Sequence, residues 1–312
     1  MSYKDRTVAV VIPAHNEAAF IGSVIRTLPS YVDTIIVVDD ASTDGTAEVA
    51  RRTEDRRVHV IILDRNSGVG GAMVAGYRLA MEVGSDIVVK MDGDGQMSPD
   101  DLPGLLDAMA EGQFVYAKGN RFLMGSPRED MPRSRFVGNM VLTFLTKLAS
   151  GYWHIFDPQN GYTAISSAAL ELLDLEMVHK GYFFENDILV QLNLHGFRVK
   201  DVPMRACYGN EASGINPVQI SVSFPRLLLQ RFLYRVYRKY MLRDFSPVAL
   251  FLLTGCALFL WGVLFGVFLW VRGKMAGVAA PTGTIMLAIV PLFIGFQLLL
   301  QGIVLDIQET PK

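Results

Sequence analysis

Over roughly the first hundred residues, short apolar runs alternate with segments whose apolar residues recur at helical spacing. The runs have the length and composition of buried strands, and the segments between them are typical of amphipathic helices. The expected strands are residues 7–13, 34–38, 58–63 and 86–91; the expected helices are 17–28, one beginning at 46 and one ending at 83. This alternation predicts an α/β fold with a mostly parallel central sheet covered by helices.

The C-terminal part has a different pattern. Residues 248–271 and 284–305 form two stretches without a charged residue. Each is longer, as a helix, than the roughly 30 Å hydrocarbon core of a bilayer. We therefore expect two transmembrane helices, with a pair of buried core helices as the alternative. Gln297 and Gln301 share a face of the second stretch and are expected to mediate helix–helix contact.

Basic residues gather just before the first uncharged stretch. They are Arg226, Arg231, Arg235, Arg238, Lys239 and Arg243, whereas the loop between the stretches has only Arg272 and Lys274. The positive-inside bias predicts that the large N-terminal part and both termini are cytoplasmic. We expect a cytosolic domain over 1–220, a juxtamembrane segment over 221–246 and a transmembrane hairpin over 247–312.

The juxtamembrane segment has two different faces. Arg231, Arg235 and Arg238 recur at helical spacing, while Phe232, Val236 and Tyr240, each four residues apart, lie on another face. This predicts an amphipathic interfacial helix whose basic side faces anionic headgroups. A simple cytoplasmic anchor for the first span is the alternative.

Composition excludes several classes of protein. The net charge of −2 gives no sign of a nucleic-acid binder. Cys207 and Cys256 are too few and too isolated for a disulfide framework or a zinc site. We expect no secretory signal, because the run 7–13 is short and no small-residue cleavage site follows it. These features fit a reducing, cytosolic compartment for the large domain.

Polar residues cluster where the expected strands end. They are His15, Asn16 and Glu17, then Asp39 and Asp40, then Asp64 and Asn66, then Asp92 and Asp94. Ligands of parallel sheets bind beyond the carboxyl ends of the strands. The sequence therefore predicts a binding site at this edge.

The segment 86–96, DIVVKMDGDGQ, suggests a metal site. Residues i and i+2 of an extended chain face the same way, so Asp92 and Asp94 can converge on one cation, with Gln96 as a further oxygen ligand. Mg²⁺ or Mn²⁺ suits such a sparse oxygen site. An acidic surface turn is the alternative.

A glycine-rich turn precedes the third expected helix. Gly68 and Gly70 begin a G-x-G-x-x-G pattern, but Met73 occupies the third glycine position, so the dinucleotide-binding fingerprint fails. We expect the start of this helix to lie near a phosphate-rich ligand. The alternative is a tight turn without a ligand.

Five motifs in order resemble the family 2 inverting glycosyltransferases of the GT-A fold. They are VVIPAHNE, VVDDASTDGT, N-x-G-x-G-x-A, MDGDGQ and FDPQNGYTAIS, within about residues 7–210. More narrowly, the chain resembles the polyprenyl-phosphate or dolichyl-phosphate hexose synthases. The resemblance implies that a nucleotide sugar and a lipid phosphate are the substrates, and that the enzyme works at a membrane.

The resemblance also implies roles for individual residues. Pro13, His15 and Glu17 would contact the base and ribose, and Asp39, with Asp40, would bind the nucleoside. Asp92, Asp94 and Gln96 would hold the metal on the diphosphate, Arg121 and Arg135 would bind the lipid phosphate, and Asp157 would sit beside the sugar. His15 stands where relatives often have Tyr. FFENDIL leaves open which of Glu185, Asn186 and Asp187 enters the site.

The implied reaction is inverting transfer of a hexose from a GDP- or UDP-linked sugar to a polyprenyl phosphate. A phosphate monoester is largely a dianion at neutral pH, so it needs guiding cations more than a base. A hydroxyl acceptor, in a glycolipid or polysaccharide, would instead need a carboxylate such as Asp187 or Asp157. A catalytically dead membrane scaffold is the alternative outside enzymes. A homo-oligomer is compatible with the chain.

Overall fold

The computed structural model describes residues 3–110, 112–123, 133–205 and 217–311. Nothing is described of the side chains of 133–137, 139 and 217–222. The chain divides into two compact units, residues 1–231 with 311–312 and residues 232–310.

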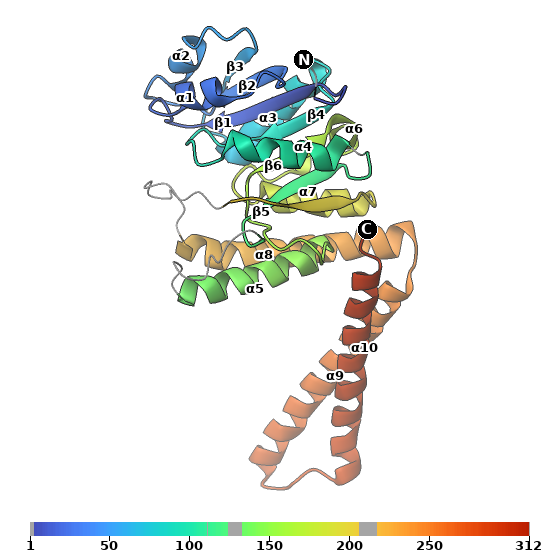
Figure 1. Cartoon of the computed structure of the whole chain (residues 1–312). Helices are drawn as coiled ribbons and strands as arrows, with labels where there is room; N and C mark the ends of the chain where they lie inside the picture. Colours follow the sequence, from blue (N-terminus) through green and yellow to red (C-terminus); the bar gives the residue numbers. More distant parts are fainter. Residues whose placement is uncertain (1–2, 111, 124–132, 206–216, 312) are drawn as a thin grey trace. The chain divides into compact units, whose positions relative to one another are not determined.

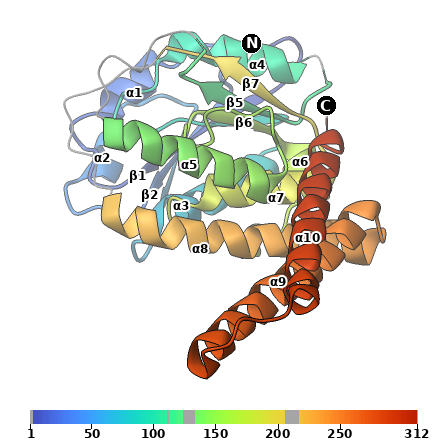
Figure 2. The same ribbon diagram turned by 90° about the horizontal axis from the view of Figure 1, so that it is seen from below.

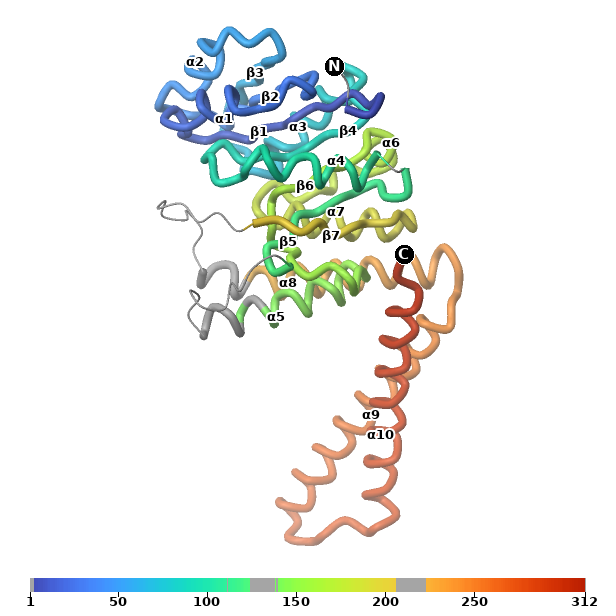
Figure 3. The backbone as a smooth tube through the Cα atoms, in the orientation of Figure 1, coloured from blue at the N-terminus to red at the C-terminus, as the bar shows by residue number. Residues whose placement is uncertain are grey.

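The first unit is built on a seven-stranded sheet (Figures 1 and 3). Its strands are β1 Val8–Ala14, β2 Thr34–Asp39, β3 Val58–Ile62, β4 Ile87–Lys90, β5 Tyr116–Asn120, β6 Thr163–Ser166 and β7 Val199–Pro203, in the order β3-β2-β1-β4-β6-β5-β7. Strand β6 is antiparallel to both of its neighbours, and the other pairs are parallel. The predicted mostly parallel α/β fold is confirmed.

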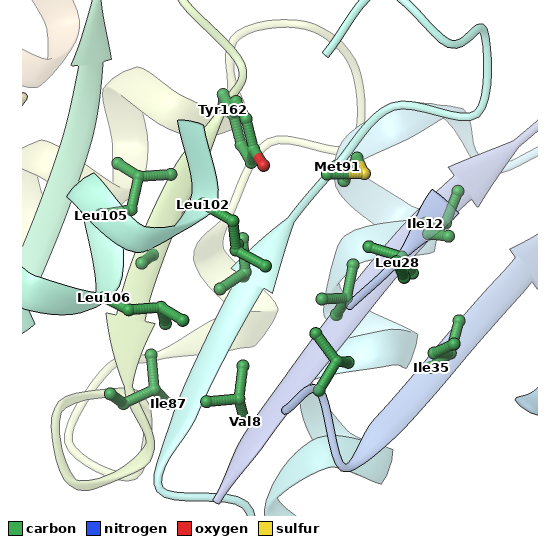
Figure 4. Packing of buried hydrophobic residues seen from close by; sticks show 14 of the residues in the cluster. Val8, Ile12, Leu28, Ile35, Ile87, Met91, Leu102, Leu105, Leu106 and Tyr162 are labelled. Atoms are coloured by element: carbon green, nitrogen blue, oxygen red, sulfur yellow. The ribbon is translucent and has the colours of Figure 1, made fainter. Parts of the chain in front are cut away.

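Helices cover both faces of this sheet because its central strands are apolar on both sides. Val8, Val10 and Ile12 of β1 pack on one core, and Ala9 and Val11 pack on the other. The first core includes α1 Ile21–Thr27, α2 Thr46–Arg51 and α4 Leu102–Ala110; Figure 4 shows part of it. The second includes α3 Gly68–Glu82, α6 Ser167–Leu170 and α7 Phe184–Leu194. Alternate side chains of one strand thus fix both helical layers.

The remaining elements of the first unit are short helical turns and one long helix. The 3₁₀ turns are Pro99–Asp101 and Leu175–Met177, and α5 spans Arg133–Ser150. Helix α8, Pro217–Arg235, begins in the first unit.

The second unit contains a long helical hairpin. A π-helical turn, Val236–Arg243, leads to α9 Pro247–Ala276 and α10 Thr282–Gln308, which lie side by side (Figures 1 and 2). Both helices are long and apolar enough to cross a membrane, and they include the stretches 248–271 and 284–305. These long apolar helices agree with the expected span positions.

Glycines set the contact between α9 and α10. A Cβ on Gly255 would lie 3.0 Å from the Gly295 carbonyl oxygen, and one on Gly262 would lie 2.7 Å from the Ala288 carbonyl oxygen. Gly302 similarly faces Leu252. Small residues allow such close backbone approach between membrane helices. Gln297 and Gln301 are exposed, so the helix–helix contact expected for them is not made inside the hairpin.

The expected basic face of the juxtamembrane helix is wrong for two of its three arginines. Arg231 forms an ion pair with Asp187, 2.6 Å from Nε to Oδ1. Arg235 is fully buried and donates from Nη1 to Asp306 at 2.6 Å, and Tyr240 donates to the same carboxylate at 2.6 Å. Both guanidinium groups are thus held by carboxylates from distant parts of the sequence, which helical spacing alone does not reveal.

Candidate active site

Three adjacent parallel strands bring the polar residues of the early motifs to one edge of the sheet. Strand β1 lies between β2 and β4, and Ala14 pairs in register with Asp39. The chain leaving β1 therefore starts beside the end of β2. The residues that follow these strands, 15–17, 39–40 and 92–94, share the carboxyl edge that the sequence predicted.

The loops after β1 and β2 are tied together by polar contacts. His15 Nδ1 lies 2.8 Å from the Asp40 carbonyl oxygen. Asn16, at a positive φ of 60°, accepts from the Thr43 amide at 2.9 Å. The buried carboxylate of Asp39 accepts from the Ser42 amide at 2.9 Å. These contacts hold His15, Asp39 and Asp40, which are expected to bind the nucleoside, close together at the sheet edge.

The glycine-rich turn before α3 packs against protein rather than presenting open amides. The Asp40 carboxylate accepts from the amides of Ser67 at 2.6 Å and Gly68 at 2.8 Å. The Gly71 amide donates to the Lys180 carbonyl at 3.0 Å. A Cβ on Gly70 would lie 2.1 Å from the carbonyl oxygen of residue 179. The amides of Ser67, Gly68 and Gly71 are therefore already hydrogen-bonded within the protein, which argues against the phosphate site expected at this helix start.

Asp92 is held by a buried lysine. Lys90 Nζ donates to Asp92 Oδ1 at 2.5 Å and lies 3.8 Å from Glu185 Oε1. Burial would lower the pKa of Lys90, but the carboxylates of Asp92 and Glu185 raise it above the ordinary lysine value. Burial raises the pKa of Glu185, and the two neighbouring lysines, Lys90 and Lys118, oppose this shift. Lys90 thus places a positive charge beneath Asp92.

The segment after β4 carries the carboxylates of Asp92 and Asp94 and the side-chain amide of Gln96. Asp94 Oδ1 accepts from the Gln96 amide at 2.9 Å, which closes the turn. A Cβ on Gly161 would lie 2.5 Å from Lys90 Nζ and 3.3 Å from Asp92 Oδ2, so a side chain at this position would have to displace the ends of the pair.

A cation here would have few protein ligands. Across the described residues, no three His, Cys, Asp or Glu side chains gather as a metal site. Asp92, Asp94 and Gln96 supply only two carboxylates and one amide oxygen. That donor set suits a hard divalent cation that completes its shell with water and substrate phosphates.

The FDPQNGY segment forms the next part of the site. Arg121 Nε and Nη2 donate to the two Asp157 carboxylate oxygens at 2.8 and 3.1 Å. The Asp157 side chain is 2% exposed and that of Arg121 is 34% exposed, so a buried anion restrains a partly accessible cation. Lys118 Nζ, from the buried centre of β5, donates to the Asn160 carbonyl. This places Lys118 under the loop that carries Asp157 and Gly161.

The predicted acceptor residues do not all join this cluster. Asp187 accepts from Arg231 and from the His179 amide, and Asn186 contacts Thr146. Of the FFENDIL polar residues, Glu185 is the one beside Lys90. The side chain of Arg135 lies outside the described part of α5.

Sequence reasoning missed Lys90 and Lys118. Each lies in a buried strand, and both side chains are almost fully buried. A lysine within an otherwise apolar central strand is itself a signal, because buried lysines are rare unless paired. The ion-pair partners come from other elements, so the sequence did not identify them.

Comparison with curated proteins reveals several relatives. The chain is 31% identical over 242 residues to a UDP-N-acetylglucosamine–dolichyl-phosphate N-acetylglucosaminyltransferase of Methanococcus voltae, covering 72% of this chain and 96% of the relative. It is 34% identical to an undecaprenyl-phosphate mannosyltransferase of Micrococcus luteus, covering 63% and 82%. It is 34% identical to a polyprenol monophosphomannose synthase of Mycolicibacterium smegmatis, covering 62% and 75%.

The fold has a match among solved structures. Glucosyl-3-phosphoglycerate synthase from Mycobacterium tuberculosis, in complex with Mn²⁺, UDP and phosphoglyceric acid, superposes with a TM-score of 0.55. That match covers 74% of this chain and 78% of the other at 23% identity, which supports the fold alone. The family described as glycosyl transferase family 2 matches residues 9–173, more than half of the chain. With its sheet, its five ordered motifs and this match, the chain belongs to glycosyltransferase family 2.

Proposed function

We propose that this enzyme transfers a hexose, with inversion, from a GDP- or UDP-linked sugar to a polyprenyl phosphate at the cytoplasmic face of a membrane. The observation that carries the proposal is the convergence of Asp39, Asp92 and Asp94 at one sheet edge, in a chain with two helices of membrane-spanning length. The relatives named above support the lipid phosphate as acceptor, since each acts on a polyprenyl substrate by name.

The donor would bind along the carboxyl edge of β1, β2 and β4. Pro13, His15 and Glu17 would contact the base and ribose, and Asp39 and Asp40 would bind the nucleoside. Asp40 would act through its carbonyl contact with His15, because its carboxylate accepts from backbone amides. The tied loops would hold this pocket ready before the donor arrives, which lowers the entropic cost of binding.

Asp92, Asp94 and Gln96 would hold Mg²⁺ or Mn²⁺ on the diphosphate. Such a cation neutralises charge developing on the leaving group, as a Lewis acid. Lys90 would orient Asp92 through the 2.5 Å contact with Oδ1, leaving Oδ2 on the side of Gly161. The side chain of residue 161 is absent, so the sugar diphosphate can approach the carboxylate closely.

The acceptor would be steered by arginine. A phosphate dianion needs no strong general base, but it must approach a negatively charged donor. Arg121, with its guanidinium oriented by Asp157, would bind that phosphate, and Arg135 would add a second positive charge. Asp157 would thereby lie beside the reacting groups. Asp187 would serve as a base only for a hydroxyl acceptor.

The membrane arrangement completes the proposal. Residues 1–220 would be the cytosolic domain, 221–246 the juxtamembrane segment and 247–312 the hairpin. Six basic residues lie before the first span: Arg226, Arg231, Arg235, Arg238, Lys239 and Arg243. They outnumber Arg272 and Lys274 between the spans, which favours a cytoplasmic catalytic domain.

The test uses the solubilised full chain with labelled GDP-mannose, UDP-glucose and UDP-N-acetylglucosamine, each with undecaprenyl or dolichyl phosphate. We expect label in the lipid phase with one donor. Asp92→Asn with Asp94→Asn should reduce transfer by about a hundredfold or more and weaken Mn²⁺ binding measured by electron paramagnetic resonance. Asp100→Asn, an exposed acid nearby, is the matched control. Label transferred only to hydroxyl acceptors, or full transfer by the double variant, would refute the proposal.

A further inference from the structure

Helix α10 has two faces, each with its own seven-residue repeat. On the first, Ala288, Leu292, Gly295, Leu299 and Gly302 meet α9 through the glycine contacts described above. On the second, half a turn away at about 100° per residue, lie Val290, Ile294, Gln297, Gln301, Val304 and Gln308. Their spacing alternates between four and three residues. That is the spacing of a helix–helix contact seam.

This second face has no partner within the described part of the chain. Val290, Ile294 and Val304 are 48%, 49% and 43% exposed, and the three glutamines are also exposed. The apolar positions alone would be ordinary lipid-facing residues. The glutamines need another explanation, since Gln297 and Gln301 lie inside the uncharged stretch, which is long and apolar enough to cross a membrane and which the proposed function places in the bilayer.

An amide in hydrocarbon is costly unless it forms hydrogen bonds. The Thr254 hydroxyl on α9 meets this need by donating to the Leu250 carbonyl at 2.6 Å. Among the described residues, the side chains of Gln297 and Gln301 have no such hydrogen bond. Their partners must therefore come from another molecule in the membrane.

We propose that this face of α10 binds the same face of a second copy of the chain. Two copies inserted with the same topology have parallel α10 helices, so Gln297 meets Gln297 and Gln301 meets Gln301 across a twofold axis along the membrane normal. An amide carries both donors and an acceptor, so it is complementary to itself. Branched residues on either side, Ile294 and Val304, would pack around the amides. The α9 contact uses the opposite face and stays intact.

Cysteine cross-linking tests this geometry. In a full-length background with Cys207→Ala and Cys256→Ala, Gln297→Cys should form a disulfide-linked dimer in phosphatidylcholine–phosphatidylglycerol vesicles under mild oxidation. Phe296→Cys is the matched control, at nearly the same depth, 51% exposed, and about 100° away around the helix. Equal cross-linking at both positions, or none at 297, would overturn the proposal.

Single-molecule photobleaching in the same vesicles tests the hydrogen bonds. The unmodified chain should bleach in two steps at protein dilutions where Gln297→Leu with Gln301→Leu bleaches in one, with association weakened about tenfold or more. Gln297→Asn with Gln301→Asn keeps the amides and should stay dimeric. One-step bleaching of the unmodified chain at every dilution would overturn the proposal and would favour lipid or a different protein as the partner. Two-step bleaching of Gln297→Leu with Gln301→Leu at the same dilutions as the unmodified chain would also overturn it.

Discussion

Two buried lysines link the chemistry of the site to its stability. Lys90 lies next to Asp92, and Lys118 reaches the Asn160 carbonyl. Neither was singled out from the sequence, whereas Asp92 and Asp94 were, because an acid pair among glycines is visible locally and a long-range ion pair is not. The difference is physical. Strands and turns depend mainly on residues adjacent in the sequence, whereas the burial of a charged side chain depends on which distant elements pack against it.

Lys118 should make stability depend on pH. Burial lowers its pKa from the ordinary 10.5 to about 8, with Glu185 and Asp157 opposing the shift. Between these values the unfolded chain holds a proton that the folded chain has lost, so this contribution to stability rises with pH. Relative to Lys118→Met, the free energy of unfolding of the unmodified enzyme should increase by on the order of 1 kcal/mol per pH unit near pH 9.

Thermal denaturation of the solubilised enzyme from pH 7 to 10 gives the measurement. Other groups titrate over the same range, so the comparison with Lys118→Met isolates the lysine. Parallel curves for the two proteins would contradict the expected pKa.

Among the helices and strands, the first four strands were predicted to within about two residues because each is a continuous apolar run. Strands β5 and β6 were not, since polar residues interrupt their apolar runs: Lys118 and Asn120 in β5, and Thr163 and Ser166 in β6. The close packing at the start of α3 was not predicted, because the partners of its glycines, residues 179–180, lie far along the sequence.

Gly76 should be intolerant of even one extra carbon. A Cβ there would lie 2.3 Å from Val11 Cγ1, so Gly76→Ala should destabilise the enzyme by about 1–3 kcal/mol through overpacking of α3 on β1. Among the residues that the structure describes, no atom beyond its own helix backbone and chain neighbours lies within 4 Å of such a Cβ on Gly138 in α5. Gly138→Ala should therefore stabilise by about 0.5–1 kcal/mol through helix propensity. Shifts of the thermal midpoint in the same direction for both variants would contradict this account.

The ion pair between α7 and α8 should contribute to stability rather than to substrate binding. Asp187 is 2% exposed, and burial raises its pKa while Arg231 opposes the shift. Arg231→Met leaves this carboxylate buried without its partner and should cost about 3–5 kcal/mol. Arg226→Met, on an exposed position of the same helix, should change stability by less than about 0.5 kcal/mol.

Chemical denaturation of the solubilised chain measures both variants. Adding Asp187→Asn to Arg231→Met should recover part of the loss, since it removes the uncompensated charge. If Arg231→Met left the free energy of unfolding unchanged, the Asp187 carboxylate would already be hydrated, and this account would be contradicted.

At the scale of the whole molecule, the sequence predicted two long apolar helices. It did not predict the contacts that attach the π-helical turn Val236–Arg243 to them. Arg235, Tyr240 and Asp306 form one buried polar cluster. Asp306→Ala leaves Arg235 uncompensated and should destabilise the second unit by about 3–5 kcal/mol. Asp244→Asn, at an exposed acid beyond the π-helical turn, should have little effect. Limited proteolysis near residue 240 should become faster only in the first variant.

The Arg235–Asp306 pair also imposes an order on biosynthesis. The two residues are 71 positions apart, and all of α9 and most of α10 are made between them. A nascent chain therefore carries an arginine whose counter-charge has not yet been translated until α10 is nearly complete. Premature termination before Asp306 would therefore yield a product whose Arg235 lacks its counter-charge.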